Sequence, residues 1–379
     1  MRSLPLRSIW QIVSEINLAE IQSEIESPFH LLIAADDEAD AEHAANRLSA
    51  PAADFYHPWI TVTDSTGSGL LSQSTEIAPR TINTRTSTSQ PSRTTPDCAL
   101  LVSTRLELSP DLVSLQQALN AQSIPSLIVV VGPEAKRPDS AIARRGEHVR
   151  VAIPDWSDRS LDRVAATLVQ IVPPSLRLPF ARRLPPLRTA ALNMLIQETS
   201  QVNASYSFTT GLGETVPGLN FVLGAGDAIV LTKNQLMMAY KIALVSGKTG
   251  SPQKLLGEIV GVLGGGFLFR QLARQMSGLI PVWGIVPKVA VAYAGTWAIG
   301  RAVTVWATEG QKITPELMSG HYREALEQGR QAAQRIVDNA RRPRQSSGAK
   351  KLPAQSKAIS SRLLRRVGKR IPRLPPRKN

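Results

Sequence analysis

An acidic run stands where a nucleotide-binding sheet usually places its phosphate loop. Residues 29–35 form a continuous apolar stretch typical of a buried parallel strand, and Asp36-Asp37-Glu38-Ala39-Asp40 follows it at the start of a predicted helix. Phosphate binding there requires glycines for close backbone approach and a lysine for positive charge. Four carboxylates at a helix N-terminus satisfy the helix dipole instead and repel phosphate. We therefore predict that nucleotide does not bind in the usual mode.

Two further positions bear on nucleotide chemistry. Asp64-Ser65-Thr66-Gly67 has the Asp-x-x-Gly spacing with which GTPases hold magnesium and the terminal phosphate, although a solvated turn explains four such residues more simply. After the predicted strand 126–131, where a guanine-reading Asn-Lys-x-Asp would follow, the chain has Gly132-Pro133-Glu134-Ala135. The nucleotide machinery is therefore expected to be missing.

Metal and thiol chemistry find little support. The five histidines lack metal-ligand spacing, and the only cysteine, Cys98, has no second cysteine nearby. One cysteine excludes an internal disulfide framework and fits a reducing compartment. His321 lies in a polar stretch and is predicted to be solvated. We predict no catalytic, cofactor-binding or metal-binding residue, and hence a protein that is not an enzyme.

The first half of the chain alternates predicted strands and helices, which indicates an α/β domain with a doubly wound, mostly parallel sheet over residues 29–172. A short amphipathic helix precedes it, within residues 1–28. Fifteen of the 33 residues in 64–96 are Ser or Thr, so this segment is predicted to be a disordered loop. The expected strands are 29–35, 60–63, 99–103, 126–131 and 148–153, and the expected helices are 39–48, 110–121 and 160–171.

The order of these elements resembles a Ras-like GTPase domain. The stretch DCALLVSTRLELSPDLVSLQQALNAQSIPSLIVVV is similar to its fourth strand, helix and fifth strand, and HVRVAIPDWSDRSLDRVAATLVQIVP to its last strand and helix. The resemblance implies a P-loop-like sheet without a P-loop. A receiver-like domain is the alternative, because LLIAADDE has that fold's paired acids at Asp36 and Asp37. Its phospho-acceptor position holds Ser103, which cannot form an aspartyl phosphate.

The second half, from residue 189 to 340, is predicted to be helical. Residues 173–188 precede it as a linker rich in Pro and Arg, or as a hinge along a membrane surface. Thr232-Lys233-Asn234-Gln235 has capping-box spacing and predicts a helix start, while Ser251-Pro252 and Thr314-Pro315 predict two more.

Two sets of small residues recur at helical spacing within this half, and they predict a glycine-zipper hairpin. Glycine costs a helix about 1 kcal/mol relative to Ala, so three in register call for close approach of another backbone. Such a hairpin could insert into a membrane or lie on it, or be a buried pair in a soluble domain. The helix-packing residues are Gly257, Gly261 and Gly265 on one helix and Ala290, Ala294 and Ala298 on the other.

Three blocks of this half resemble a bacterial family, domain of unknown function 697, also called YcjF-like. They are PGLNFVLGAGDAIVLTKNQLMMAYKIALVSG, GEIVGVLGGG and LIPVWGIVPKVAVAYAGTWAIGRA. The resemblance implies a membrane-associated module that follows GTPase domains, and it brings no catalytic residue. Asp227 and Lys233 are charges within the first block. They are candidate contacts with a partner GTPase, or simply a helix cap and a solvated lysine.

The net charge of +14 comes from one segment. Residues 341–379 hold 14 of the 44 Lys and Arg and no acid, which leaves 30 basic against 30 acidic residues elsewhere. A basic amphipathic helix there predicts binding to anionic lipid, a disordered tail and nucleic-acid contact being the alternatives. The membrane-surface candidates are Arg362, Arg365, Arg366, Lys369 and Arg370.

Taken together, these patterns predict a non-catalytic scaffold or regulatory protein in the cytoplasm, associated with or inserted in the plasma membrane. A noncanonical GTP-binding protein and a soluble nucleic-acid-binding protein are the alternatives. No targeting segment is expected, because Glu15, Glu20 and Glu24 interrupt the apolar residues near the N-terminus.

Overall fold

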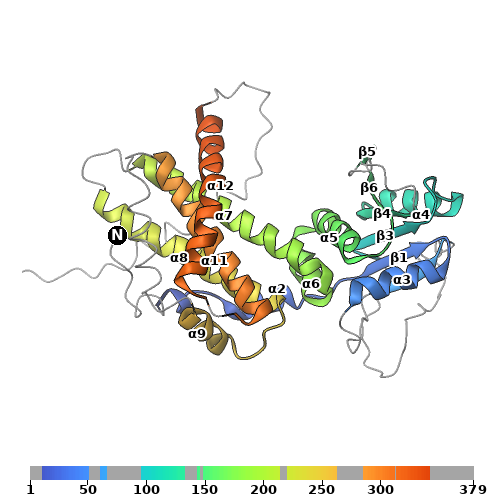
Figure 1. Ribbon diagram of the computed structural model, residues 1–379, viewed down its shortest axis with the longest axis horizontal. Helices are drawn as coiled ribbons and strands as arrows, with labels where there is room; N and C mark the ends of the chain where they lie inside the picture. The colour runs from blue at the N-terminus through green and yellow to red at the C-terminus, as the bar shows by residue number, and fades with distance from the viewer. Residues whose placement is uncertain are drawn as a thin grey trace, which may run out of the picture. The chain divides into compact units, whose positions relative to one another are not determined.

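The structure of the protein is a computed structural model (Figure 1). It describes residues 11–50, 60–65, 95–132, 143–145, 148–213, 220–262, 285–311 and 313–341. By its internal contacts the chain divides into a unit of Met1–Ile336 and a second unit of Val337–Asn379. In the second unit the structure describes only residues 337–341. The predicted loop falls mostly outside the described residues, and the basic tail does so from residue 342 onward.

The described part of the first half forms a sheet of six strands in the order β2-β1-β3-β4-β6-β5. Five strands are parallel, and β5 runs antiparallel to β6 at one edge. The predicted α/β class and mostly parallel sheet are confirmed. The strands are β1 (Leu31–Ala35), β2 (Ile60–Asp64), β3 (Cys98–Ser103), β4 (Ser126–Val131), β5 (Ala143–Arg145) and β6 (His148–Ile153).

Helices cover both faces of the sheet, which explains why β1 and β3 are apolar at every position but the last of β3. Side chains of a strand alternate between faces. Leu31 and Ile33 of β1 lie on the face of the sheet that α3 (Glu38–Ser49) and α5 (Asp158–Ile171) cover, while Leu32 lies on the opposite face with α4 (Pro110–Ala121). Every residue of β1 and β3 is buried.

The segment predicted as a linker is instead helical and buried. It comprises η3 (Pro174–Leu176), α6 (Arg177–Arg183) and η4 (Pro185–Leu187). Phe180 is fully buried and stacks on Phe29, which shortly precedes the sheet, with ring centroids 3.9 Å apart. Prolines fit this segment because two of them occupy first helical positions, where no backbone N–H is required. The linker prediction was wrong because the apolar side chains of this segment outweigh its prolines and arginines.

The arginines of this connector cap the ends of helices. The guanidinium of Arg182 donates to the carbonyl of Leu244, and Arg183 donates to that of Glu26 at 3.2 Å. Arg188 donates to the carbonyls of Ala181 and Arg182, at 3.3 and 3.1 Å. The last carbonyls of a helix lack partners within it and carry negative partial charge, so a cation stabilises them. These side chains are therefore engaged within the protein.

The N-terminal helix is interrupted, whereas the sequence predicts one continuous element. Residues 11–14 are helical, and α2 (Leu18–Ile25) begins after Asn17, whose side chain accepts from the backbone N–H of Glu20 at 3.2 Å. Asparagine competes with the helix by bonding nearby backbone, which makes it a cap here. The ammonium of Lys241 lies 3.0 Å from a carboxylate oxygen of Glu24 and ties α2 to the second half.

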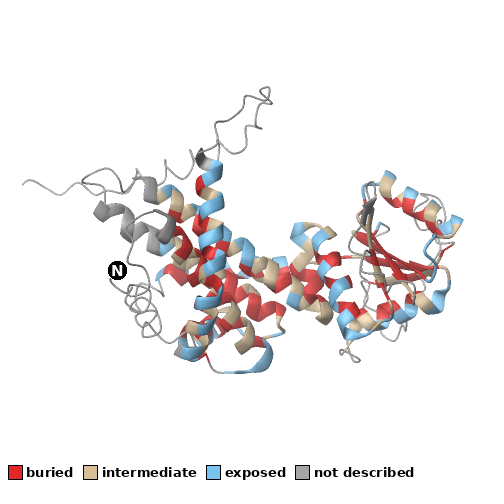
Figure 2. Cartoon of the chain, turned by 45° about the horizontal axis from the view of Figure 1, so that its top comes forward, coloured by how far each residue is buried: buried red, intermediate tan, exposed pale blue. Residues whose placement is uncertain are grey.

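The second half is helical, as predicted. Its helices are α7 (Arg188–Gly213), α8 (Asn220–Val245), α9 (Pro252–Val262), α11 (Ile285–Glu309) and α12 (Pro315–Arg341). α7 and α11 are antiparallel, because Asn203 bonds Thr296 while Asn193 bonds Arg301. From residue 288 to 307, no residue of α11 is exposed (Figure 2). The apolar side chains of this part of α11 are therefore covered by other parts of the protein.

Two of the three predicted helix starts are confirmed. The hydroxyls of Ser251 and Thr314 accept backbone N–H groups at the starts of α9 and α12, at 3.4 and 3.3 Å. The predicted start at Asn234 is wrong, because α8 runs without a break from Asn220 to Val245. Polar residues can lie inside a helix when neighbouring helices supply their hydrogen bonds, as described below.

Among the helices that the structure describes, none has an apolar stretch long enough for a membrane span.

Candidate functional site at the carboxyl edge of the sheet

The strand order reverses between β1 and β3. The chain first adds β2 on one side of β1 and then crosses to place β3 on the other. In open parallel sheets, ligands bind outside the carboxyl ends of the strands at such a switch point. The residues that follow β1 and β3 are therefore the first candidates for function.

The structure brings Asp36 and Ser103 together at this point. The hydroxyl of Ser103 lies 3.3 Å from an oxygen of the Asp36 carboxylate and 3.2 Å from the carbonyl of Arg105, and it accepts the backbone N–H of Arg105. Because a serine has one proton, it donates to one of these two acceptors at a time. The other carboxylate oxygen of Asp36 is buried and has no hydrogen-bond partner among the described residues.

The remaining acids of the sequence motif gather at the same edge. Asp37 caps α3, its carboxylate accepting the N–H of Ala39 at 3.0 Å, and Glu38 and Asp40 follow in the first turn. Asp64 ends β2 in register with Ala35. Within the described residues, this edge presents carboxylates to a ligand where a phosphate cradle would present glycine N–H groups and a lysine.

Gly132 directly follows β4 at this edge, and its N–H donates to the carbonyl of Ile153 at 3.0 Å. A Cβ at this position would lie 3.7 Å from the carbonyl oxygen of Thr104, an ordinary contact. The glycine is therefore not required by close packing. Residues 133–135, which stand in the place of a guanine-recognition motif, lie outside the described part of the chain.

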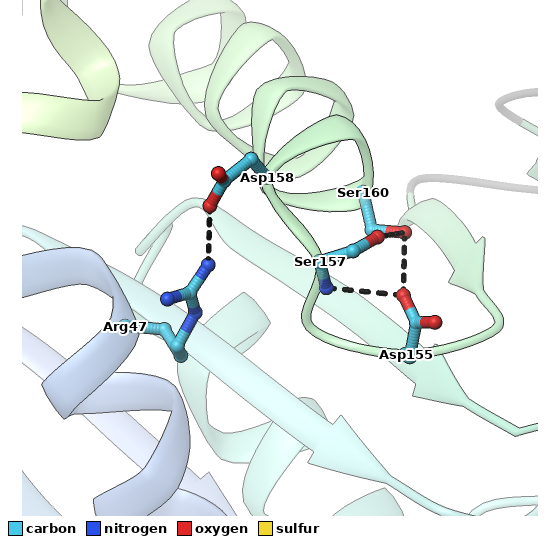
Figure 3. Close-up of polar contacts among 5 residues, drawn as sticks. All are labelled: Arg47, Asp155, Ser157, Asp158 and Ser160. Carbon is cyan, nitrogen blue, oxygen red and sulfur yellow. Dashed lines mark hydrogen bonds and ion pairs between the residues drawn. The ribbon is translucent and has the colours of Figure 1, made fainter.

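A polar turn between β6 and α5 was missed by the sequence reasoning (Figure 3). The carboxylate of Asp155 accepts from the N–H of Ser157 at 3.0 Å and from the hydroxyl of Ser160 at 3.3 Å. Asp158 pairs with Arg47 of α3 at 2.7 Å, but its side chain is 97% exposed, so the pair adds little stability. The Asp-x-Ser spacing, which favours such turns, was the available signal. The turn therefore fixes the start of α5.

Metal and thiol chemistry remain without support in the described part of the chain. No three His, Cys, Asp or Glu side chains there are placed to share a metal ion. Cys98 is buried, and burial raises the pKa of its thiol to about 12. It stays protonated at neutral pH and is a poor nucleophile.

Comparison with known proteins gives no relative: no family model, no curated protein and no solved structure matches the chain. The Ras-like, receiver-like and YcjF-like resemblances therefore stay predictions.

The predicted helix-packing residues occupy different surroundings. Gly257 is half-buried in α9, Gly261 is exposed with no described atom within 4 Å of the place where a Cβ would lie, and Gly265 lies outside the described residues. On α11, the alanines are buried at 2% exposure or less. Those alanines are Ala290, Ala294 and Ala298. The glycine zipper itself stays a prediction, since one of its three glycines is undescribed.

Close contacts between helices in this half involve glycines that the sequence reasoning did not select. A Cβ on Gly329 of α12 would lie 2.6 Å from the carbonyl oxygen of Ala290, and one on Gly300 would lie 2.6 Å from the side chain of Ile196. Glycine at these places lets α12 approach α11, and α11 approach α7. Their single occurrences gave no repeat that a spacing search could detect.

A buried hydrogen-bond network joins three helices. Asn203 of α7 donates to the hydroxyl of Thr296 on α11 at 2.9 Å, and Gln235 of α8 donates to the same hydroxyl at 3.1 Å. Asn234 donates to the side-chain oxygen of Asn203 at 2.8 Å. Asn203 and Thr296 are fully buried. Thus Asn234 and Gln235, predicted to lie at a helix start, instead fix the pairing of α7, α8 and α11.

The remaining candidates are only partly placed. Lys233 is half-buried on α8, and Asp227 lies on the same helix, where its side chain is outside the described part. The candidate membrane-surface residues of the tail also lie outside the described residues.

Proposed function

We propose that this protein is a non-catalytic scaffold or regulatory protein, in which a degenerate GTPase-like domain works at the cytoplasmic face of a membrane. The observation that carries the non-catalytic half is the cluster of acids at the switch point. Asp36, Asp37 and Asp64 stand where a nucleotide would bring its phosphates. Like charges there disfavour a bound triphosphate without a bridging cation.

The membrane half rests on the charge of residues 341–379. Fourteen basic residues without an acid attract an anionic lipid surface, at about 1 kcal/mol for each basic residue close to it. The rest of the chain is balanced in charge and would neither add to this attraction nor oppose it.

Flotation with vesicles tests the membrane half. The full chain should float with vesicles containing an anionic phospholipid and stay at the bottom with phosphatidylcholine alone. Replacing Arg362, Arg365, Arg366, Lys369 and Arg370 together with Gln should abolish flotation, because the segment keeps its length and loses its charge. A wild-type protein that stays soluble with anionic vesicles would refute this half of the proposal.

A noncanonical GTP-binding protein is the second candidate, favoured by one observation. The register of β1 and β2 sets Asp64 beside Ala35, at the edge where a magnesium ion and a terminal phosphate would sit. Titration with a fluorescent guanine nucleotide discriminates the two. Micromolar binding that is lost in Asp64→Ala and kept in Asp37→Ala would favour this candidate, and no binding supports the scaffold.

A further inference from the structure

Helix α12 meets α11 at a close contact, called the seam below, which is formed by Gly329 and Ala333 of α12 and by Val289 and Ala290 of α11. Met318 and Tyr322 near its start are almost fully buried, and farther along Ala333 packs with Val289 and Ala290 of α11. The missing side chain of Gly329 lets the two backbones meet there. The outward positions of α12 are charged or polar, so the helix carries its own solvated face.

His321 lies on α12 with only 17% of its side chain exposed, so the prediction that it is solvated was wrong. Its Nε2 atom is buried without a hydrogen-bond partner among the described residues, and its Nδ1 atom lies 3.8 Å from a carboxylate oxygen of Glu324 on the same helix. The positive charge of Arg301 on α11 disfavours a second positive charge on the ring. That guanidinium is held by Asn193 of α7, to which it donates at 2.9 Å.

The surroundings of His321 favour its neutral form over its protonated form. Burial lowers the pKa of His321 below its ordinary value, Arg301 lowers it further, and Glu324 opposes them. Protonation would place a second cation near Arg301 and leave a charged N–H buried without an acceptor. The compensating pair with Glu324 is weak, since that carboxylate is 64% exposed and screened by water.

We infer that the packing of α12 against α11 is sensitive to acid, because α12 loosens from α11 when His321 becomes protonated. Because the folded protein holds the proton less tightly than the unfolded chain, the seam is at full strength above the ordinary histidine pKa. It weakens as the pH falls from there toward the lower pKa of the folded state. Loosening would uncover Val289 and Ala290. This inference does not depend on the proposed membrane role.

Hydrogen exchange of the full chain, read by mass spectrometry at about pH 7.5 and about pH 5.5, tests it. Peptides from α12 are compared with peptides from α4 in the same sample, so that the chemical pH dependence of exchange cancels. Wild-type α12 should lose protection relative to α4 at the lower pH, by up to about tenfold for each unit between the two pKa values.

The variants make the test specific. The glutamine of His321→Gln cannot be protonated, so the ratio of α12 protection to α4 protection should be the same at both pH values. His43→Gln on helix α3 should behave as wild type. Arg301→Gln should weaken the response and Glu324→Gln should strengthen it, which keeps the test decisive even if His321→Gln folds poorly. A wild-type ratio that does not change with pH, or one that falls equally in His321→Gln, would overturn the inference.

Discussion

Replacing Gly329 with Ala tests how closely α12 is fitted to α11. The added Cβ would lie 2.6 Å from the carbonyl oxygen of Ala290 and 3.3 Å from its carbonyl carbon and Cα, all of them backbone atoms. Real Cβ atoms essentially never come within 2.6 Å of such an atom. Backbone cannot rotate away as a side chain can, so the two helices must separate locally.

The size of the effect follows from two opposing terms. Forcing a methyl group into a packed seam costs about 1–3 kcal/mol, whereas Gly→Ala inside a helix gains up to about 1 kcal/mol. Gly320 supplies the matched control, because it lies in the same helix with no described atom within 4 Å of a Cβ. Gly320→Ala should therefore stabilise the protein by about 0.5–1 kcal/mol, and the two variants should differ by about 1–3 kcal/mol.

Urea unfolding followed by circular dichroism measures that difference. Comparing two variants that gain the same helix propensity isolates the packing term, provided that both transitions have the same slope. Gly329→Ala should unfold at a lower urea concentration than Gly320→Ala. If both variants shift the midpoint upward by equal amounts, α12 is not seated on α11 at this position and the description of the seam is wrong.

Three further predictions concern other parts of the fold. Phe180→Ala should destabilise the protein by about 3–5 kcal/mol in the same urea assay, because this fully buried ring stacks on Phe29. Ser123→Gly should raise the melting temperature, with a gain of up to about 1 kcal/mol, since φ of 59° is strained for serine and favourable for glycine. Thr296→Val should cost about 1–3 kcal/mol in urea unfolding, because it leaves amide donors of Asn203 and Gln235 buried or half-buried without an acceptor; an unchanged midpoint would show that the network is dispensable.

The sheet domain could be predicted well from the sequence because its signals are local. β4 and β6 begin and end where the expected strands do, and α4 begins at Pro110 after its cap Ser109. The acids Asp36 and Asp37 were located on the correct edge for the same reason, since a residue that follows a parallel strand must lie at its carboxyl end. The contact of Asp36 with Ser103, 67 residues away, needed the strand order.

The helical half was harder, since which helices meet is not a local property. Ala294 and Ala298 signalled close packing, but the spacing could not say that α7 lies antiparallel to α11. The sequence reasoning predicted a linker for residues 173–188 because prolines and arginines are usual in solvated linkers. Here Arg182 caps α8, whose last carbonyls come from a segment 62 residues later in the chain.

The stacking of Phe180 on Phe29 and the arginine caps have a practical consequence for anyone dividing the chain. Fragments that begin or end between the sheet domain and the helical half would cut through shared interior, leaving aromatic rings facing water on one piece and bare carbonyls on the other. Soluble fragments should be sought with both halves and the intervening turns retained.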